Sequence, residues 1–277
     1  MSLPRFGPHD DPGPDFAALL RLSRSGGHAG APDAASGSLP SVSPSEIPHG
    51  TTCVAVRYDS GVVLAGDRRA TAGHLISNHR IEKVFPADRH SGVAIAGAAG
   101  PSTEMVRLFQ LQLEHYEKVE GTPISLEGKA NQLGQMVRAN LPAAMQGLVV
   151  VPIFAGFDTA ASRGRIFEYD VTGGRYEERD HAATGSGSLH ADIVVKLGFR
   201  PSMARAAATD LVLDALFVAS DADSATGGPD PVRDVFPVVA VIDADGYRRI
   251  DDAELRRRTE RLVRRHRSRR EADGGAS

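Results

Sequence analysis

The composition of the chain changes abruptly at residue 51. Residues 1–50 are rich in Gly, Pro, Ser and Asp and contain too few apolar residues to form a core of their own. From Thr51 onward, apolar runs with the periods of strands and helices follow one another. The chain has 277 residues, of which 41% are apolar. We therefore expect a largely disordered segment, residues 1–50, ahead of a folded domain over residues 51–250.

Charge and cysteine content narrow the class of protein. The net charge of −3 gives no general attraction to nucleic acid or to anionic membranes. Cys53 is the only cysteine, which excludes an intramolecular disulfide and fits a reducing compartment. No apolar run is long enough to span a membrane, and the N-terminal segment has acidic residues where a signal peptide would be positive. We expect a cytoplasmic protein with no membrane segment, no nucleic-acid partner and no metal site.

The apolar pattern after residue 51 predicts strands and helices in groups rather than in strict alternation. Such grouping indicates an α+β domain in layers. Both groups of strands look apolar on more than one face, which two packed sheets with helices outside would explain. The expected strands are 52–58, 62–67, 92–99, 149–157, 165–171, 235–243 and 247–250, and the expected helices are 101–120, 126–141, 188–197 and 202–219.

The C-terminal segment, residues 251–277, is rich in arginine. Nine arginines lie between Arg256 and Arg270. They could bind a polyanion, or they could simply cover a solvated helix end. Leu262 and Val263 are the only apolar residues in that stretch and no aromatic residue lies among the arginines. This pattern favours a solvated, partly disordered helix end.

Thr51 is the residue whose position suggests chemistry. A Thr-Thr pair at the start of a strand is usually explained by β-propensity alone. Here, however, Thr51 is the first residue of the folded domain and follows Gly50, whose carbonyl can be approached closely. If the bond between them is cut, Thr51 gains a free α-amine with a pKa near ~8, which can act as a general base for its own hydroxyl. We therefore expect Thr51 to be a catalytic nucleophile, activated by cleavage after Gly50.

Asp67 and Lys83 are the charged residues expected beside Thr51. Each follows the previous candidate by 16 residues, and a hairpin would bring Asp67 back close to Thr51. A partly buried lysine paired with an aspartate would favour loss of the threonine proton. When these two residues are taken alone, a purely structural ion pair explains them somewhat better.

Three polar, glycine-rich segments offer hydrogen-bonding groups. The segment Gly97–Gly100 lies between an apolar strand and a helix, where exposed backbone N–H groups could hold an oxyanion. Thr184–Ser188 and Asp223–Gly228 read first as surface turns. Alternatively, their hydroxyl and carboxylate groups could orient the Thr51 amine.

Together these segments resemble the catalytic β subunits of bacterial proteasomes. The similarity covers nearly all of residues 50–250, with the motifs in the same order and at similar separations. It implies the N-terminal-nucleophile hydrolase fold, a four-layer αββα sandwich, and a threonine endopeptidase that needs no cofactor. The motifs are Gly50–Thr52, Gly66–Thr71, Ile81–Lys83, Gly97–Gly100, Thr184–Ser188 and Asp223–Gly228.

The resemblance assigns roles to single residues. Thr51 would be the nucleophile, with Asp67 and Lys83 as the charged pair beside it and Gly97 supplying an oxyanion N–H. Three further residues would surround the terminal amine, namely Ser186, Asp223 and Thr226. Many family members have serine at the last position, and Thr226 keeps the hydroxyl.

The resemblance also implies how substrate binds. The backbone of Thr71, Gly97 and Ala99 would pair with an extended polypeptide, as an added strand pairs with a sheet edge. A pocket beside Thr51 would be apolar and uncharged, which predicts chymotrypsin-like cleavage after hydrophobic residues. Its expected lining is Ala70, Ile81, Phe85, Ile95 and Ala99.

Members of this family assemble in rings. The resemblance implies proteasome α subunits as partners, with homo-heptameric β rings stacked in an α7β7β7α7 core. The helices at 101–120 and 126–141 are candidates for the ring contacts. The arginine-rich, lysine-poor composition fits an actinobacterial source, which would imply a ring ATPase activator and substrates tagged with a ubiquitin-like protein. Residues 1–50 would be a propeptide that is removed on maturation.

Other interpretations remain open on the sequence. An HslV-type peptidase also begins with Thr-Thr, although 227 residues from Thr51 to the end is long for that group. Amidohydrolases of the same fold act on small amides but lack this set of loops. A non-catalytic, β-like structural subunit would be expected to have lost Thr51, Lys83 or Gly50, and all three are present.

Overall fold

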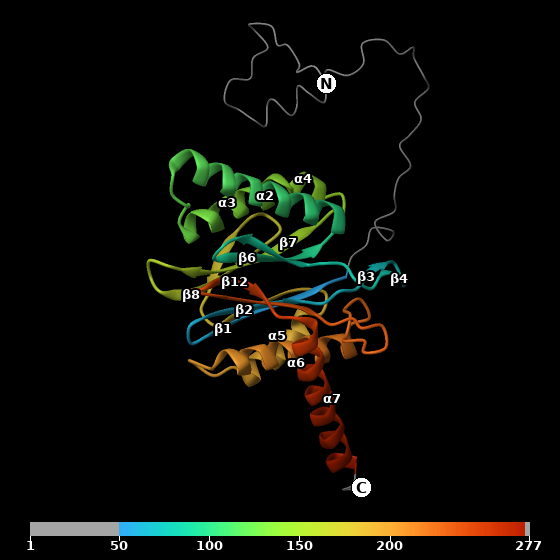
Figure 1. Ribbon diagram of the computed structural model, residues 1–277. Helices are drawn as coiled ribbons and strands as arrows, with labels where there is room; N and C mark the ends of the chain where they lie inside the picture. The colour runs from blue at the N-terminus through green and yellow to red at the C-terminus, as the bar shows by residue number, and fades with distance from the viewer. Residues whose placement is uncertain (1–49, 275–277) are drawn as a thin grey trace, which may run out of the picture. The chain divides into compact units, whose positions relative to one another are not determined.

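Two five-stranded antiparallel sheets face each other in the computed structural model, which describes residues 50–274 (Figure 1). The expectations for residues 1–49 lie outside the described residues. The first sheet has the order β10 (His181–Gly185), β1 (Thr52–Tyr58), β2 (Gly61–Gly66), β11 (Val238–Asp243) and β12 (Gly246–Arg249). The second has the order β5 (Val84–Asp88), β6 (Ser91–Gly97), β7 (Val150–Asp158), β8 (Arg163–Tyr169) and β9 (Arg175–Glu178).

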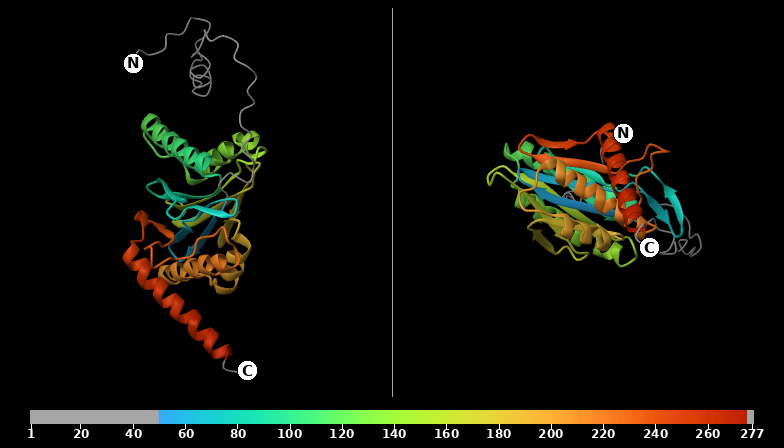
Figure 2. Two further views of the ribbon diagram at one scale, coloured as in Figure 1. Left: turned by 90° about the vertical axis from the view of Figure 1, so that its right-hand side faces the viewer. Right: turned by 90° about the horizontal axis from the view of Figure 1, so that it is seen from below.

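Helices cover the outer face of each sheet (Figures 1 and 2). α2 (Ala99–Glu120), α3 (Leu126–Ala139) and the short α4 (Leu141–Ala144) lie on the side of the second sheet. α5 (Ser188–Gly198) and α6 (Arg205–Ala222) lie on the side of the first. The buried apolar residues form three clusters, one under each helix layer and one between the sheets. The predicted α+β sandwich of four layers, αββα, is confirmed.

The central strands are apolar on both faces because each face meets a different layer. In β1, Val54 and Val56 pack in the cluster under α5 and α6. Cys53 and Ala55, on the opposite face, pack in the cluster between the two sheets. All four side chains are fully buried. The two-sided apolar pattern of the sequence thus follows from a sheet covered on both sides.

Several elements differ from the sequence-based expectation. α6 begins at Arg205 rather than at residue 202, because Ser202 adopts a left-handed conformation with φ of 57°. α3 ends at Ala139 rather than at residue 141, and Pro142 lies in the first turn of α4, where proline needs no N–H partner. Five short strands escaped prediction: β5, β9, β10 and the hairpin of β3 (Ala70–Ala72) with β4 (Leu75–Asn78).

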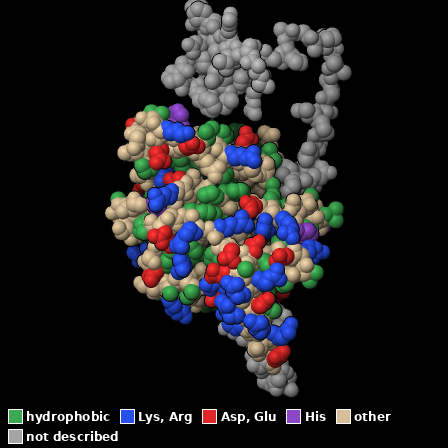
Figure 3. Space-filling view, in the orientation of Figure 1, with side chains coloured by type: hydrophobic (Ala, Val, Ile, Leu, Met, Phe, Trp, Pro, Cys, Tyr) green, Lys and Arg blue, Asp and Glu red, His purple; other side chains and the backbone are tan. Residues whose placement is uncertain are grey.

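The arginine-rich segment forms the helix α7 (Asp252–Gly274), and its first half packs more closely than expected. Leu255 is fully buried and Leu262 is 5% exposed, both in the cluster of the first sheet. Arg258 donates to Asp210 on α6 at 2.6 Å, and Arg265 donates to Asp214 at 2.8 Å. The expected solvated segment is therefore partly built into the domain, and basic side chains gather on its visible face (Figure 3). None of the helices in the described part of the chain is long and apolar enough to cross a membrane.

Candidate active site

The β1–β2 hairpin brings Thr51 and Asp67 together. Thr51 directly precedes β1 and Asp67 directly follows β2, and Cys53 pairs with Gly66 across the two strands. The Asp67 carboxylate therefore lies at the start of β1, where its Oδ1 accepts the backbone N–H of Thr52 at 2.8 Å. Thr51 is 4% exposed and Asp67 is fully buried. The spacing of 16 residues thus places the two side chains at one end of the hairpin.

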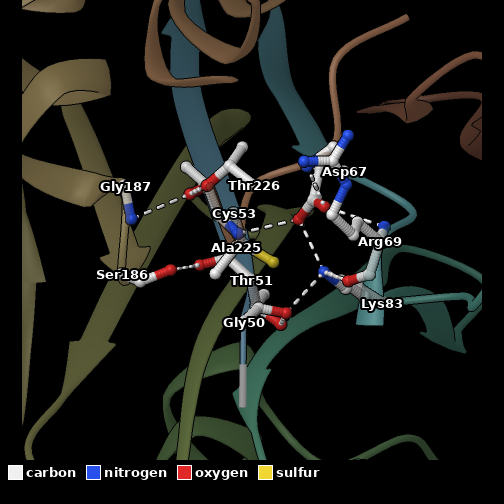
Figure 4. Close-up of polar contacts among 12 residues, drawn as sticks. Gly50, Thr51, Cys53, Asp67, Arg69, Lys83, Ser186, Gly187, Ala225 and Thr226 are labelled. Carbon is white, nitrogen blue, oxygen red and sulfur yellow. Dashed lines mark hydrogen bonds and ion pairs between the residues drawn. The ribbon is translucent and has the colours of Figure 1, made fainter. Parts of the chain in front are cut away.

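Lys83, just before β5, supplies the buried positive charge. Its ammonium group donates to Oδ1 of Asp67 at 2.6 Å, to the carbonyl oxygen of Gly50 at 2.9 Å and to the carbonyl oxygen of Arg69 at 2.6 Å (Figure 4). These three bonds use all three ammonium protons. The Lys83 and Asp67 side chains are 5% and 0% exposed. Such a buried pair is costly to break, because removal of one partner leaves an uncompensated charge.

Asp67 is held from both sides. Its Oδ2 accepts the backbone N–H groups of Arg69 at 2.9 Å and Gly227 at 2.8 Å. The carboxylate therefore has four N–H donors, one of them charged, and its orientation toward Lys83 is fixed. A carboxylate held in this way is better suited to keeping Lys83 in place than to transferring a proton itself.

The Thr51 hydroxyl lies against the peptide bond between Gly50 and Thr51. Oγ1 donates to the carbonyl oxygen of Gly50 at 2.5 Å. A side chain at residue 50 has no room, since an added Cβ would lie 2.7 Å from Oγ1 of Thr71 and 2.8 Å from Cβ of Ala225. The absence of a side chain at Gly50 thus allows the close approach of the hydroxyl to the carbonyl group.

A second polar group lies on the other side of Thr51. The Ser186 backbone N–H donates to the carbonyl oxygen of Thr51 at 2.9 Å, and its hydroxyl donates to Oδ2 of Asp223 at 2.6 Å. Thr226 Oγ1 donates to the same carboxylate oxygen at 2.6 Å. The hydroxyl of Thr226 also contacts Oγ1 of Thr52 at 2.6 Å. Ser186, Asp223 and Thr226 are therefore brought together beside the Thr51–Thr52 peptide.

The pKa of Asp223 is lowered in this group. Burial alone would raise the pKa, but hydrogen bonds from Ser186, Thr226 and the Ala225 N–H outweigh it, with a smaller contribution from the charge of His190. Asp223 is therefore an ionised, acceptor-only group at neutral pH.

The segment that contains Ser186 is a surface turn only in part. Ser186 and Gly187 form a turn in which Ser186 is exposed, but the residues before them are in a strand. Thr184 and Gly185 belong to β10, and Gly185 pairs with Thr52. Gly185 has φ of 99°, and an added Cβ would lie 2.0 Å from the carbonyl oxygen of Thr51. The short pairing of β10 with β1 is what carries Ser186 to Thr51.

Gly97 ends β6 on the same side of the site. It has φ of 120°, and an added Cβ would lie 2.0 Å from the carbonyl oxygen of Val149. The following residue, Ala98, donates its N–H to that same carbonyl oxygen at 2.8 Å. Glycine is thus required where the strand turns into α2, next to Thr51.

A pocket opens beside Thr51. Its empty volume, including the part open to solvent, is about 340 Å³. The five residues expected to line it all do so, while Thr71 lies on β3 next to the lining residue Ala70. The lining is less uniformly apolar than expected, because three polar residues take part besides Thr51 and Lys83. The lining comprises Gly50, Thr51, Ala70, Ile81, Glu82, Lys83, Phe85, Ile95, Gly97, Ala99, Ser102 and Thr103.

The three additional polar lining residues, Glu82, Ser102 and Thr103, were not found from the sequence. Glu82 is paired with Arg249 at 2.7 Å, and Thr103 donates to the carbonyl oxygen of Ala99 at 3.0 Å. The buried Ser102 hydroxyl has no hydrogen-bond partner in the structure. Ser102 and Thr103 could have been predicted, since they lie near the start of the helix that follows Gly97. Among residues 50–274, no three His, Cys, Asp or Glu side chains form a group that could hold a metal ion.

Comparisons with known proteins show the family of the chain. The sequence model of the family described as "Proteasome subunit" matches residues 47–232. A protein named "Proteasome subunit beta" from Acidimicrobium ferrooxidans is 61% identical over 255 residues, which cover 92% of this chain and 91% of that protein. A protein of the same name from Streptomyces griseus is 58% identical over 209 residues, which cover 76% of this chain and 74% of that protein. The chain therefore belongs to the proteasome subunit family and is a β subunit of the actinobacterial type.

Proposed function

We propose that this chain is a threonine endopeptidase that creates its own nucleophile by cutting the bond between Gly50 and Thr51. The observation that carries the proposal is the pair of hydrogen bonds on one oxygen atom. The Gly50 carbonyl oxygen accepts from Oγ1 of Thr51 at 2.5 Å and from Nζ of Lys83 at 2.9 Å. The attacking hydroxyl and a positive charge thus converge on the carbonyl group that has to react.

The first step is the cut itself. Oγ1 of Thr51 attacks the Gly50 carbonyl carbon, and Lys83 stabilises the negative charge that develops on its oxygen. The C–N bond then breaks, the departing nitrogen takes up the proton that the hydroxyl has lost, and Gly50 is left as an ester on Oγ1. Water hydrolyses this ester to a Gly50 carboxylate and restores the hydroxyl. The products are a released N-terminal segment and a Thr51 with a free α-amine.

The second step uses that amine in turnover. The neutral amine takes the proton of the Thr51 hydroxyl, which then attacks a substrate carbonyl. Lys83, held by Asp67, keeps a positive charge next to the reacting oxygen. The backbone N–H of Gly97 is proposed to hold the oxyanion, and Ser186, Asp223 and Thr226 to orient the amine. An acyl-enzyme forms as the peptide C–N bond breaks, and water then releases it.

The pocket supports a preference for hydrophobic residues on the N-terminal side of the cut. Ile81, Phe85 and Ile95 give it apolar walls, and no lining residue other than Glu82 and Lys83 carries a charge. Those two charges are paired, with Arg249 and Asp67 respectively. We propose that the substrate binds as an extended strand along the backbone of Thr71, Gly97 and Ala99.

Exposed apolar side chains on two helix layers support assembly into rings. On α2, Leu111 is 54% exposed and Val119 is 66% exposed. On α5, Leu189, Ile193 and Leu197 form one stripe with spacing of four residues, 67%, 49% and 74% exposed. α3, the other helix expected to make ring contacts, has no large exposed apolar side chain along its described length. Two apolar faces on opposite layers fit a β subunit with neighbours at both ends.

We propose that these neighbours are α subunits and a second β ring, in an α7β7β7α7 core. The family's chambered architecture would confine cutting to unfolded polypeptide. A ring ATPase activator and substrates tagged with a ubiquitin-like protein belong to the same proposal, as does a cytoplasmic location. Their support is the similarity to the actinobacterial β subunits and the single, buried cysteine.

The experiment that tests the function is hydrolysis of fluorogenic peptides by the chain after co-assembly with an α partner. We expect cleavage after hydrophobic residues, none in Thr51→Ala, and inhibition by reagents that acylate an N-terminal threonine. Hydrolysis of small amides but not of peptides would favour the amidohydrolase alternative. Equal activity of the wild type and Thr51→Ala would show that the chain is not the catalyst.

A further inference from the structure

Thr52, the residue after the candidate nucleophile, has a side chain that strand propensity alone does not explain. Its hydroxyl is fully buried, lies 2.6 Å from Oγ1 of Thr226 and accepts the backbone N–H of Gly187 at 3.1 Å. Gly187 is the N-cap residue of α5. The Thr52 side chain therefore links the start of β1 to the segment that follows β10 and to the segment that follows α6.

The direction of each hydrogen bond between these hydroxyl groups can be assigned. Thr226 Oγ1 donates its single proton to Oδ2 of Asp223 at 2.6 Å, so it must accept from Thr52. Thr52 Oγ1 accepts from Gly187 and donates to Thr226. Ser186 donates to Oδ2 of Asp223 from the other side at 2.6 Å. Two hydroxyl groups thus form a directional relay that ends on one carboxylate oxygen.

The backbone of Thr52 joins the same relay to the lysine pair. The Thr52 N–H donates to Oδ1 of Asp67 at 2.8 Å, and that oxygen also accepts from Lys83 at 2.6 Å. The preceding carbonyl oxygen, that of Thr51, accepts from the Ser186 N–H at 2.9 Å. Thr52 is therefore the residue through which both polar groups of the site are tied to the nucleophile.

We infer that Thr52 is a positioning residue that holds Asp223 and Ser186 against the Thr51 amine in the processed enzyme. This inference rests on the proposed function, because only a processed chain has that amine. Cooperative hydrogen bonding along a buried chain of hydroxyls strengthens its last bond, here the one on Asp223. Without the Thr52 hydroxyl, Thr226 loses its donor and the Gly187 N–H loses its acceptor, so the bond from Thr226 weakens and the carboxylate is held less firmly.

The test compares Thr52→Val, which keeps the shape and removes the hydroxyl, with Thr52→Ser, which keeps the hydroxyl. Each is co-assembled with an α partner, and intact mass establishes that the chain begins at Thr51. For Thr52→Val we expect kcat/KM for a fluorogenic peptide to fall by about tenfold or more, the size of one buried hydrogen bond left unmade. For Thr52→Ser we expect kcat/KM to stay within about twofold of the wild-type value. A change of that size is no larger than a surface substitution causes.

The pH profile separates positioning from a merely structural role. A carboxylate beside the amine favours its protonated form, so a displaced Asp223 should shift the acid limb of kcat/KM to lower pH in Thr52→Val. The charged groups around the amine are Asp67, Lys83, Arg69, Asp223 and His190, and all are unchanged between Thr52→Val and Thr52→Ser. The difference between their profiles therefore reports on the hydroxyl alone.

The outcomes distinguish this inference from the function on which it rests. A lower rate with an unshifted acid limb, or equal losses in Thr52→Val and Thr52→Ser, would show that Thr52 only supports the fold. If Thr52→Val does not assemble, Thr52→Ala also removes the hydroxyl and is compared with Thr52→Ser in its place. Lack of activity in the wild type would instead contradict the proposed function itself.

Discussion

Lys83 Nζ lies 2.9 Å from the carbonyl oxygen of Gly50, one residue before the candidate nucleophile. The same ammonium group is held by Asp67, which is fully buried and anchored by backbone N–H groups. A positive charge is thus fixed where negative charge would develop if the Thr51 hydroxyl attacked this carbonyl group. Because the charge is already in place, no reorganisation is needed at the moment of reaction.

Replacement of Lys83 by methionine should abolish both the cut and peptide hydrolysis. The substitution removes the charge that stabilises the oxyanion, an effect of at least about 100-fold. It also leaves Asp67 buried without its partner, so the free energy of unfolding should fall by roughly 3–5 kcal/mol. The cut is measured by intact mass and stability by urea unfolding of the precursor.

A matched control for that substitution is Lys118→Met. Lys118 forms an exposed pair with Glu114 on α2, with 72% of its side chain accessible. Exposed pairs contribute little, so the free energy of unfolding should hardly change. If a folded Lys83→Met chain were cut after Gly50 at the wild-type rate, Lys83 would have no part in the mechanism.

Ile95→Glu should suppress cleavage after hydrophobic residues. Ile95 is 3% exposed and lines the pocket beside Thr51, so the variant places a carboxylate on an apolar wall. We expect kcat/KM for such substrates to drop by about tenfold or more, since an unpaired carboxylate in the pocket disfavours burial of an apolar side chain beside it. A panel of fluorogenic peptides measures the preference, with Val171→Glu, at a 40% exposed position, as the control. An unchanged preference would exclude this pocket assignment.

Gly185→Ala should destabilise the precursor and slow its cut. The added Cβ would lie 2.0 Å from the Thr51 carbonyl oxygen, on a residue with φ of 99°. We expect a loss of at least about 1–3 kcal/mol, the range for a strained backbone position. Gly100→Ala is the control, because an added Cβ there has no atom within 4 Å and the residue lies in α2. That change should stabilise the chain slightly. Equal stability of the two variants would contradict the close packing of β10 against Thr51.

The ion pair between Asp88 and Lys129 should make stability depend on pH in the acid range. Burial alone would raise the pKa of Asp88, but Lys129 and hydrogen bonds from Ser91 and His90 outweigh burial and lower it. A lowered pKa in the folded state means that unfolding binds a proton as pH falls. The contribution is therefore fully present above the unfolded pKa, near ~4, and is lost as pH falls through the folded value.

Urea unfolding of the precursor from pH 7 to pH 3 measures that dependence. Asp88→Asn should lower stability at pH 7 and flatten the acid limb of the stability curve. Asp59→Asn, at an exposed turn where Asp59 accepts a hydrogen bond from Ser60, should change neither. Parallel curves for wild type and Asp88→Asn would show that this pair does not link α3 to the second sheet.

The layered fold was predictable because long apolar runs carry a strong periodic signal. β1, β2, β6 and β7 are buried on both faces, and α2 has a stripe that includes Phe109 and Leu113. The unpredicted strands lack such a pattern. β4 is exposed at every residue, β5 contains Pro86, and β9 is made of polar residues, so only their tertiary pairing defines them.

The site was predictable as a set of residues but not as a network. Spacing and resemblance indicated Thr51, Asp67 and Lys83, and the structure brings them together. Thr52 was taken for ordinary β-propensity, because the reason for its hydroxyl lies 174 residues away at Thr226. The hydrogen bond from Lys83 to the carbonyl oxygen of Arg69 likewise could not be predicted, because a backbone acceptor does not depend on the type of residue.

The first half of α7 was mispredicted for a related reason. Only Leu262 and Val263 stand among the arginines, too few to suggest a buried face. Leu255, before the arginine-rich stretch, supplies the missing contact, and Asp210 and Asp214 on α6 pair with two of the arginines. The arginine-rich helix therefore packs against the domain because its ion-pair partners lie on another helix, α6.

The mass of the assembled chain tests the central claim most directly. The full-length wild type and Thr51→Ala are each co-assembled with an α partner, and the intact mass of each chain is measured over time. The proposed mechanism predicts that the wild type loses residues 1–50 and begins at Thr51, while Thr51→Ala keeps its full mass. A wild type that keeps residues 1–50, or a Thr51→Ala chain that loses them at the same position, would contradict it.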